Sequence, residues 1–354
     1  MASPTKSIGA SQTQEDVIAT FPVPRGGVNR RASEVEIQPS DLWIGENLHL
    51  FQGEARQRPS WNLQTDSTLA VPLGATLGSP VGIFTCHRPD TRNQFLILGG
   101  TKQVHVLAST GYVSIASWGA TRARTNQVRM TEIAIGTPLQ SNVVICNGID
   151  TPIRLKLPTT GDPSAANVAS LNPPVAAPAG AWKDVCTASD RIVGITNTEV
   201  QWGESLQVDD PGPAFPATAV KSLAETLDLC VAVRPIGTLN VGVWKERSFW
   251  VGAARGGSTA SYFSWRVMRW VDGPAAPNAL CQDTIGNWYW ITKLGRIVMM
   301  DPQNFTVTYP GDGVWPITRA EMPVAFSQYG VSFAFYRPFF DEVWFFYQGT
   351  AYGA

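Results

Sequence analysis

Short apolar runs recur along the chain, and most are followed by a polar or glycine-containing turn and a second apolar run. Six segments share this pattern: 95–108 (FLILGGTKQVHVLA), 143–157 (VVICNGIDTPIRLKL), 192–205 (IVGITNTEVQWGES), 241–253 (VGVWKERSFWVGA), 288–301 (WYWITKLGRIVMMD) and 343–354 (VWFFYQGTAYGA). The runs are rich in Val, Ile, Trp, Tyr and Phe, which fit the packed surface of a β-sheet. Each segment is therefore predicted to be a β-hairpin.

Residues at the predicted turns support the hairpins. Gly99-Gly100, Asn147-Gly148 and Leu294-Gly295 supply positions that tolerate a positive φ. No segment shows the sustained apolar spacing of an amphipathic helix. The best helix candidate, 220–230 (VKSLAETLDLC), is short enough to be a strand or a single turn.

The hairpins repeat at a nearly constant interval. Their first residues lie 48, 49, 49, 47 and 55 positions apart. A period of about 40 to 50 residues with strands and no helix is typical of a β-propeller, in which small sheets bury each other's faces around an axis. The sequence predicts an all-β chain. We expect a β-propeller of about six blades over residues 68–354.

The two ends of the chain complete this picture. Residues 1–67 are predicted to be an N-terminal extension that packs on the propeller or on a neighbouring subunit. The sixth hairpin ends the chain, so its blade lacks outer strands. A strand within residues 68–84 is predicted to complete it. The proline-rich stretches 163–181 and 209–217 are unsuited to central strands and are expected to be surface connections.

Composition adds that much of the surface is covered. Charged residues make up 16% of the 354 residues, below the roughly 25% that is usual. With 26 Pro, 32 Gly and 13 Trp, this indicates a β-rich chain with large contacts to neighbouring subunits. The formal net charge of −1 lacks the basic footprint of a dedicated DNA-binding domain.

The cysteines and the N-terminus bear on the compartment. The five cysteines include no C-x-x-C pair and mostly lie in apolar runs, so we expect buried free thiols in a reducing environment. The first 20 residues lack the apolar core of a signal peptide. No window reaches the roughly 18 apolar residues of a membrane span. The protein is expected to be made in the cytosol and to stay or be assembled there.

Groups that carry chemistry are sparse. The three histidines, His49, His87 and His105, lack metal-binding spacing and are assigned structural roles. His105 alternates with Val104 and Val106, which predicts that it faces solvent or a subunit contact. The sequence contains no G-x-S-x-G, Walker A or sialidase-type Asp-box motif. It therefore assigns no catalytic, cofactor-binding or metal-ligating residue and predicts a protein that is not an enzyme.

Three further groups have competing interpretations. The pair Asp209-Asp210 is either a solvated turn or a cation site. The arginine clusters Arg25/Arg30/Arg31 and Arg122/Arg124/Arg129 are either loop and interface residues or weak phosphate contacts. In 288–290, Trp288 and Trp290 are predicted to share one face of a strand and Tyr289 the other. Core packing is favoured over ligand stacking or a subunit interface, and Trp244 and Trp250 repeat the theme.

Three blocks of the chain carry a pattern that goes beyond the hairpin repeat. The first is 21–61, where the matching residues are Gly26, Gly27, Asn29, Asn47, Gly53, Arg56, Arg58 and Pro59. The second is 189–212, with Asp190, Arg191, Trp202, Gly203 and Ser205. The third is 273–301, with a Gly and an Ala-Pro, then Gly-x-x-Tyr and Gly-Arg-Ile. Together these blocks cover about a quarter of the chain. In their residues and their order they resemble the β-propeller hub or nozzle proteins of short-tailed bacteriophages.

The resemblance implies a structural protein of the virion tail, assembled in the host cytoplasm. A ring of six copies beneath the portal and adaptor proteins would extend the DNA channel and help retain and eject the genome. Partners would be other copies of the chain, the portal and adaptor, and genomic DNA that passes without sequence-specific binding. Tail fibre or needle proteins are further candidate partners. Two alternatives stay open: a soluble propeller that binds a carbohydrate or peptide, and a propeller hydrolase.

Overall fold

The computed structural model describes 77–88, 93–109, 111–135, 140–171, 181–204, 215–313, 315–322, 329–338 and 341–347, together with four short strands nearer the N-terminus. The chain divides into two compact units, 1–63 and 64–354. In the first unit, β1 (Gly27–Val28) pairs in parallel with β2 (Asp41–Leu42). There, β3 (Leu48–Phe51) and β4 (Glu54–Gln57) form an antiparallel hairpin. The predicted packing of this extension on the propeller or a neighbouring subunit stays a prediction.

The described part of the second unit holds five four-stranded antiparallel sheets. The sheets comprise β5 (Pro80–His87), β6 (Gln94–Gly100), β7 (Gln103–Ala108) and β8 (Gly111–Ser117); β9 (Arg129–Ile135), β10 (Gln140–Cys146), β11 (Ile153–Lys156) and β12 (Val168–Ser170); β13 (Asp184–Ala188), β14 (Arg191–Ile195), β15 (Glu199–Trp202) and β16 (Val220–Ser222); β17 (Cys230–Ile236), β18 (Asn240–Lys245), β19 (Ser248–Ala254) and β20 (Phe263–Trp270); and β21 (Leu280–Gln282), β22 (Trp288–Ile291), β23 (Ile297–Met300) and β24 (Val307–Thr308). Within each sheet, every strand pairs with the next one along the chain.

A sixth sheet follows with two described strands, β25 (Phe333–Arg337) and β26 (Glu342–Phe346). It is preceded by one short helix, α3 (Trp315–Glu321). The sequence did not predict this helix, because seven residues are too few to display a helical period. Two 3-10 turns, η2 (Ala165–Asn167) and η3 (Thr259–Ser261), lie in the connections before β12 and β20.

The predicted hairpins are confirmed in the five four-stranded sheets. In each sheet the hairpin consists of the second and third strands, from β6–β7 to β22–β23. The first run of the sixth segment is β26, again the second strand of its sheet, while 348–354 lie outside the described residues. The doubtful segment 220–230 contains β16 and the first residue of β17.

The predicted completion of the last sheet is wrong for residues 80–84. These residues belong to β5, which is the first strand of the first four-stranded sheet and pairs with β6. They are therefore already used within their own sheet, and residues 68–76 lie outside the described part of the chain.

Neighbouring sheets pack face to face, as alternation along β10 shows. Val143 and Ile145 join a core with the β5–β8 sheet. Val144 and Cys146 point to the other side and join a core with the β13–β16 sheet. A strand buried on both faces reads as a continuous apolar run, which explains the VVIC stretch. Further cores lie between the β13–β16 and β17–β20 sheets and between the β17–β20 and β21–β24 sheets.

The tryptophans fill these cores as predicted. Trp288 and Trp290 are buried on one face of β22, while Tyr289 is only half-buried. The Trp244 ring, from β18, lies 5.4 Å from the Trp288 ring and 6.1 Å from the Trp290 ring. Trp250 is also buried, against the β13–β16 sheet. Core packing of these aromatic residues is confirmed.

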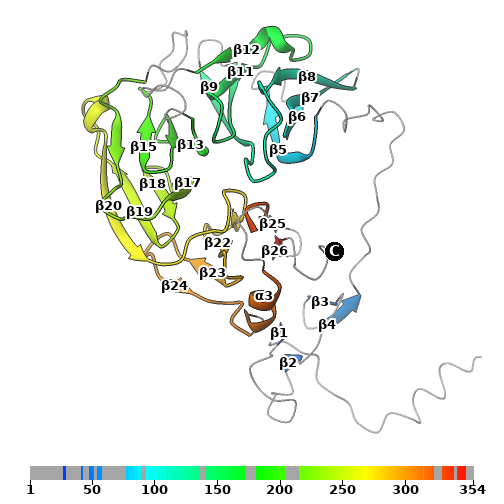
Figure 1. Cartoon of the computed structure of the whole chain (residues 1–354), viewed down its shortest axis with the longest axis vertical. Helices are drawn as coiled ribbons and strands as arrows, with labels where there is room; N and C mark the ends of the chain where they lie inside the picture. The colour runs from blue at the N-terminus through cyan, green and yellow to red at the C-terminus, as the bar shows by residue number, and fades with distance from the viewer. Residues whose placement is uncertain are drawn as a thin grey trace, which may run out of the picture. The chain divides into compact units, whose positions relative to one another are not determined.

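Small antiparallel sheets stacked in chain order give the second unit a β-propeller-like architecture. In Figure 1 the first strands β5, β13 and β17 lie nearer the middle of this unit than β8, β15 and β20. The middle of this unit is called the axis below.

Candidate functional site

Asp184, the first residue of β13, is the centre of a buried polar network at this axis. Its side chain is fully buried. Oδ1 accepts hydrogen bonds from Arg129 Nε and from the Val185 N–H, both at 2.9 Å. Oδ2 accepts from the Val233 N–H at 2.9 Å and from Arg234 Nη1. Four donors from three inner strands thus saturate one carboxylate.

The two arginines make the centre cationic. Arg129 begins β9 and Arg234 lies in β17, so they reach Asp184 from the sheets on either side of it. Burial lowers the pKa of Arg234, the Arg129 guanidinium lowers it further, and Asp184 opposes both effects. Backbone and amide oxygens share the excess charge: Arg234 Nη2 donates to Pro277 O at 2.7 Å, and Arg129 Nη1 donates to Asn278 Oδ1.

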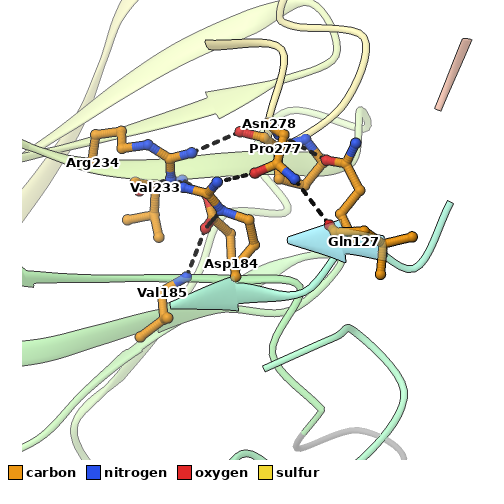
Figure 2. Close-up of polar contacts among 9 residues, drawn as sticks. Gln127, Asp184, Val185, Val233, Arg234, Pro277 and Asn278 are labelled. Carbon is orange, nitrogen blue, oxygen red and sulfur yellow. Dashed lines mark hydrogen bonds and ion pairs between the residues drawn. The ribbon is translucent and has the colours of Figure 1, made fainter. Parts of the chain in front are cut away.

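Gln127 and Asn278 extend the network to the remaining inner strands (Figure 2). The Asn278 N–H donates to Gln127 Oε1 at 2.8 Å, and Asn278 Nδ2 donates to Val81 O, in β5, at 3.3 Å. Gln127 Nε2 donates to Ser332 O at 3.0 Å, just before β25. Gln127, Arg129, Asp184, Arg234 and Asn278 are called the hub network below. Through it, residues in or just before the first strand of each of the six described sheets of the second unit are connected.

A cavity of about 400 Å³ lies beside the hub network. Its lining includes Gln127, a member of the network, and Pro277, whose carbonyl accepts the hydrogen bond from Arg234. Two kinds of segment line it. The first is the stretch that enters an innermost strand, represented by Asn126, Lys183, Leu229 and Tyr329. The second is the turn between a second and a third strand, represented by Asn197, Glu246 and Lys293. The cavity therefore lies where equivalent ends of five sheets converge.

The cavity carries charge in a mostly apolar wall. Lys183 Nζ donates to the Cys230 carbonyl at 3.2 Å. Burial lowers the pKa of Lys183, and nearby Cys230 and Glu246 oppose this. Burial raises the pKa of Tyr329, and the Glu246 carboxylate raises it further. Lys183, Tyr329 and Glu246 thus come from three different sheets and influence each other across the cavity.

The structure separates the predicted arginine clusters. Arg129 belongs to the hub network, and Arg122 pairs with Asp150 through Nε and Oδ2 at 2.8 Å. Arg124 is exposed. Arg25, Arg30 and Arg31 lie outside the described residues, as does the pair Asp209-Asp210. Of the predicted basic residues that the structure describes, only Arg129 comes to the site, and it does so as an ion-pair partner.

The prediction for His105 is wrong, because this side chain is only 3% exposed. Its Nε2 lies 3.1 Å from Gln103 Oε1, and burial lowers its pKa. The sheet is covered on the face that strand alternation assigned to solvent. His87 is exposed, and its Nδ1 lies 3.6 Å from Oε2 of Glu132. The side chain of His49 lies outside the described residues.

The thiols behave as structural groups. All five cysteines are free; Cys86, Cys146, Cys186 and Cys230 are buried and Cys281 is half-buried. Among the residues that the structure describes, no group of three His, Cys, Asp or Glu side chains is placed to hold a metal ion. No helix in the described segments is long and apolar enough to cross a membrane.

Sequence reasoning missed most of the site. The sequence analysis does not single out Asp184, Asn278 or Lys183, and it interprets Arg129 as a loop or interface residue. One signal was present: Lys183 and Asp184 interrupt the apolar stretch AW–VC, where the structure begins β13. A charged residue at the beginning of an inner strand is costly to bury unless it is paired, so it indicates a partner.

Comparisons with known proteins add a general likeness of fold. No protein-family model matches the chain, and no curated protein matches it. The WD40 domain of Neurospora crassa Pan2 is 10% identical, with a TM-score of 0.37 over 65% of this chain and 64% of that domain. A Lactobacillus plantarum protein is 8% identical, with a TM-score of 0.40 over 61% of this chain and 66% of its own. The fission yeast SCAP WD40 domain is 9% identical, with a TM-score of 0.34 over 62% and 55%. The chain thus spans less than two thirds of these proteins.

Proposed function

We propose that this protein is a structural component of a bacteriophage tail, a hub or nozzle protein of the short-tailed type. About six copies would form a ring beneath the portal and adaptor, extend the DNA channel and help retain and eject the genome. The two-stranded β25–β26 sheet would be the inner half of a sixth blade in each copy. The observation that carries the proposal is that residues of the second and third resemblance blocks join neighbouring sheets.

In the second block, Arg191 and Trp202 connect the β13–β16 sheet to the next one. Arg191 Nη1 donates to the Gly203 carbonyl at 2.7 Å, and its guanidinium lies 3.9 Å from the centre of the Tyr262 ring. Trp202 Nε1 donates to the Thr259 carbonyl at 2.6 Å. The contacts with Tyr262 and Thr259 join the two sheets. Such joined sheets suit a stiff ring component.

In the third block, the GPAAPN stretch enters the axis. Gly273 lies so close to the preceding sheet that an added Cβ would be 1.9 Å from the Lys245 carbonyl oxygen. Its N–H donates to the Glu246 carbonyl at 2.9 Å. Five residues later, Asn278 joins the hub network. The block therefore fixes the β17–β20 sheet to the β21–β24 sheet and to the centre.

The hub network also bears on where DNA would pass. Its ion pairs occupy the axis of a single copy, so the axis is packed with protein. In this proposal the duplex passes between copies arranged in a ring. The near-neutral chain, with 27 basic and 28 acidic residues, would let DNA slide without the salt-sensitive attraction of a basic surface.

Contact between copies would use exposed apolar residues of the outer strands. Trp270, at the end of the outermost strand β20, is 70% exposed. Exposed tryptophans are frequent anchors of protein interfaces. We expect Trp270→Ser to weaken assembly without unfolding the chain, because the side chain contributes little to the core.

The test is assembly with the phage portal and adaptor proteins, observed by electron microscopy and by sedimentation. The expected result is a sixfold complex in which this chain forms the layer below the adaptor. Trp270→Ser should reduce incorporation, while Lys221→Ser, on the exposed outer strand β16, should not. Failure of the unaltered chain to join any portal–adaptor complex would contradict the proposal, as would its absence from purified virions.

The alternative, a propeller that binds a carbohydrate or peptide, is favoured by one observation. The cavity beside the hub network has the size and the mixed apolar and polar lining of a small-molecule site. This alternative expects a monomer that binds ligand and does not join the portal–adaptor complex. The same sedimentation experiment therefore separates the two functions.

A further inference from the structure

We propose that the cavity beside the hub network is a binding site for a carboxylate-bearing sugar. The cavity measures about 400 Å³, within the range of roughly 300 to 1,000 Å³ that is typical of small-molecule sites. The inference is independent of the tail role, since a virion protein and a soluble module could both carry such a site.

The charges in the lining favour an anion. Lys183 and Lys293 provide two ammonium groups, and Glu246 is the acidic residue that lines the cavity with them. Among the described residues, no carboxylate lies within ion-pair distance of either lysine, and Lys183 Nζ makes its hydrogen bond to a backbone carbonyl. A bound carboxylate would form charge-assisted hydrogen bonds with these lysines.

The positions of the lysines favour an organic ligand over a small inorganic ion. Lys183 precedes β13, whereas Lys293 lies in the turn between β22 and β23. The whole β17–β20 sheet separates their two sheets in chain order. A molecule that engages both sides of the cavity needs several polar groups on one framework, as a sugar acid has.

The remaining lining fits hydroxyl groups and a pyranose face. Asn126 and Asn197 present amides that can donate and accept, and Glu246 can accept from hydroxyls. Leu229, which is 40% exposed, and Pro274 provide apolar surface against the C–H face of a sugar ring. Amides and a carboxylate beside apolar walls can orient a polyhydroxylated ring as well as retain its charge.

The test uses calorimetric titration of the full chain with three probes: sodium D-glucuronate, D-glucose and inorganic phosphate. The expected result is saturable binding of glucuronate with one site per chain, and at least tenfold weaker binding of the other two. Equal binding of glucose would show that the lysines are not used. Equal binding of phosphate would show a general anion site. Either result, or no glucuronate binding at millimolar concentration, would overturn the assignment.

Variants locate the binding. Lys293→Met should weaken glucuronate binding by about tenfold or more, because it removes one charged hydrogen bond. Its side chain is half-buried in a turn, so the chain is expected to fold. Lys183→Met should have a similar effect, with folding checked by circular dichroism.

Lys102→Met is the matched control, because Lys102 occupies the equivalent turn of the β5–β8 sheet and does not line the cavity. Unchanged binding by Lys293→Met, or equal loss in Lys102→Met, would refute the site.

Discussion

Arg129 and Asp184 are joined by an ion pair of 2.9 Å between Nε and Oδ1, across two neighbouring sheets and 55 residues of chain. The carboxylate is fully buried, and Arg234 reaches it from the opposite side. A propeller-like stack has no single central core, since each core lies between two sheets. The buried pair places a polar centre where the inner strands converge, and this geometry leads to the first prediction.

Asp184→Asn should strongly destabilise the protein. The substitution leaves the buried Arg234 guanidinium and the half-buried Arg129 guanidinium without a counter-charge. Breaking a buried ion pair in this way typically costs about 3–5 kcal/mol. The measurement is the free energy of unfolding in urea. Asp312→Asn is the control, because the Arg296–Asp312 pair is about one-quarter exposed and should contribute less than about 1 kcal/mol. Similar losses in the two variants would contradict the central role of Asp184.

Gly194→Ala tests the close packing of Trp182 on β14. A Cβ at Gly194 would lie 2.1 Å from the Trp182 ring, so the ring must move. Overpacking of this kind costs about 1–3 kcal/mol. Gly119→Ala is the control, since nothing lies within 4 Å of its added Cβ. Urea unfolding and near-ultraviolet circular dichroism should both change in the first variant and stay constant in the second.

Asp228 should make stability fall in acid. Burial raises the pKa of Asp228, but hydrogen bonds from the Arg247 N–H, Thr226 and Ser248, with the charge of buried Lys245, bring it below its ordinary 3.8. A lowered carboxyl pKa contributes stability above pH 3.8 that is lost as the pH falls through the folded-state value. The destabilisation caused by Asp228→Asn should therefore be larger at about pH 6 than at about pH 3. A constant difference in unfolding free energy would refute this linkage.

The thiols should be unreactive in the native protein. Burial raises the pKa of Cys86, Cys230 and Cys281 to about 12, and raises those of Cys146 and Cys186 as well. Thiolate is the reactive form, so labelling with a disulfide reagent near neutral pH should be slow until guanidinium is added. Cys281, the least buried, should react first, and Cys281→Ser should remove that phase. Rapid labelling of two or more native thiols would contradict the buried arrangement.

The sequence by itself determined the strands and their repetition. The runs VVIC and VGVW are apolar at consecutive positions because both faces of each strand are covered. In FLIL and WYWI, buried residues are interrupted by half-buried ones. Turn residues such as Asn147-Gly148 mark where the chain reverses. These are local properties, so they are visible in one dimension. The short helix at 315–321 escaped because two turns of chain carry too little periodicity.

Only the tertiary structure decided the site and the ends of the stack. Asp184, Arg234 and Pro277 meet although 50 and 43 residues separate them along the chain, and no local pattern encodes which buried charge pairs with which. His105 was misassigned because strand alternation gives the two faces of a strand and not what covers each face. Residues 80–84 were misassigned because a strand's own pattern does not choose its sheet. Pairing and coverage depend on how sheets stack in space, and that depends on the whole chain.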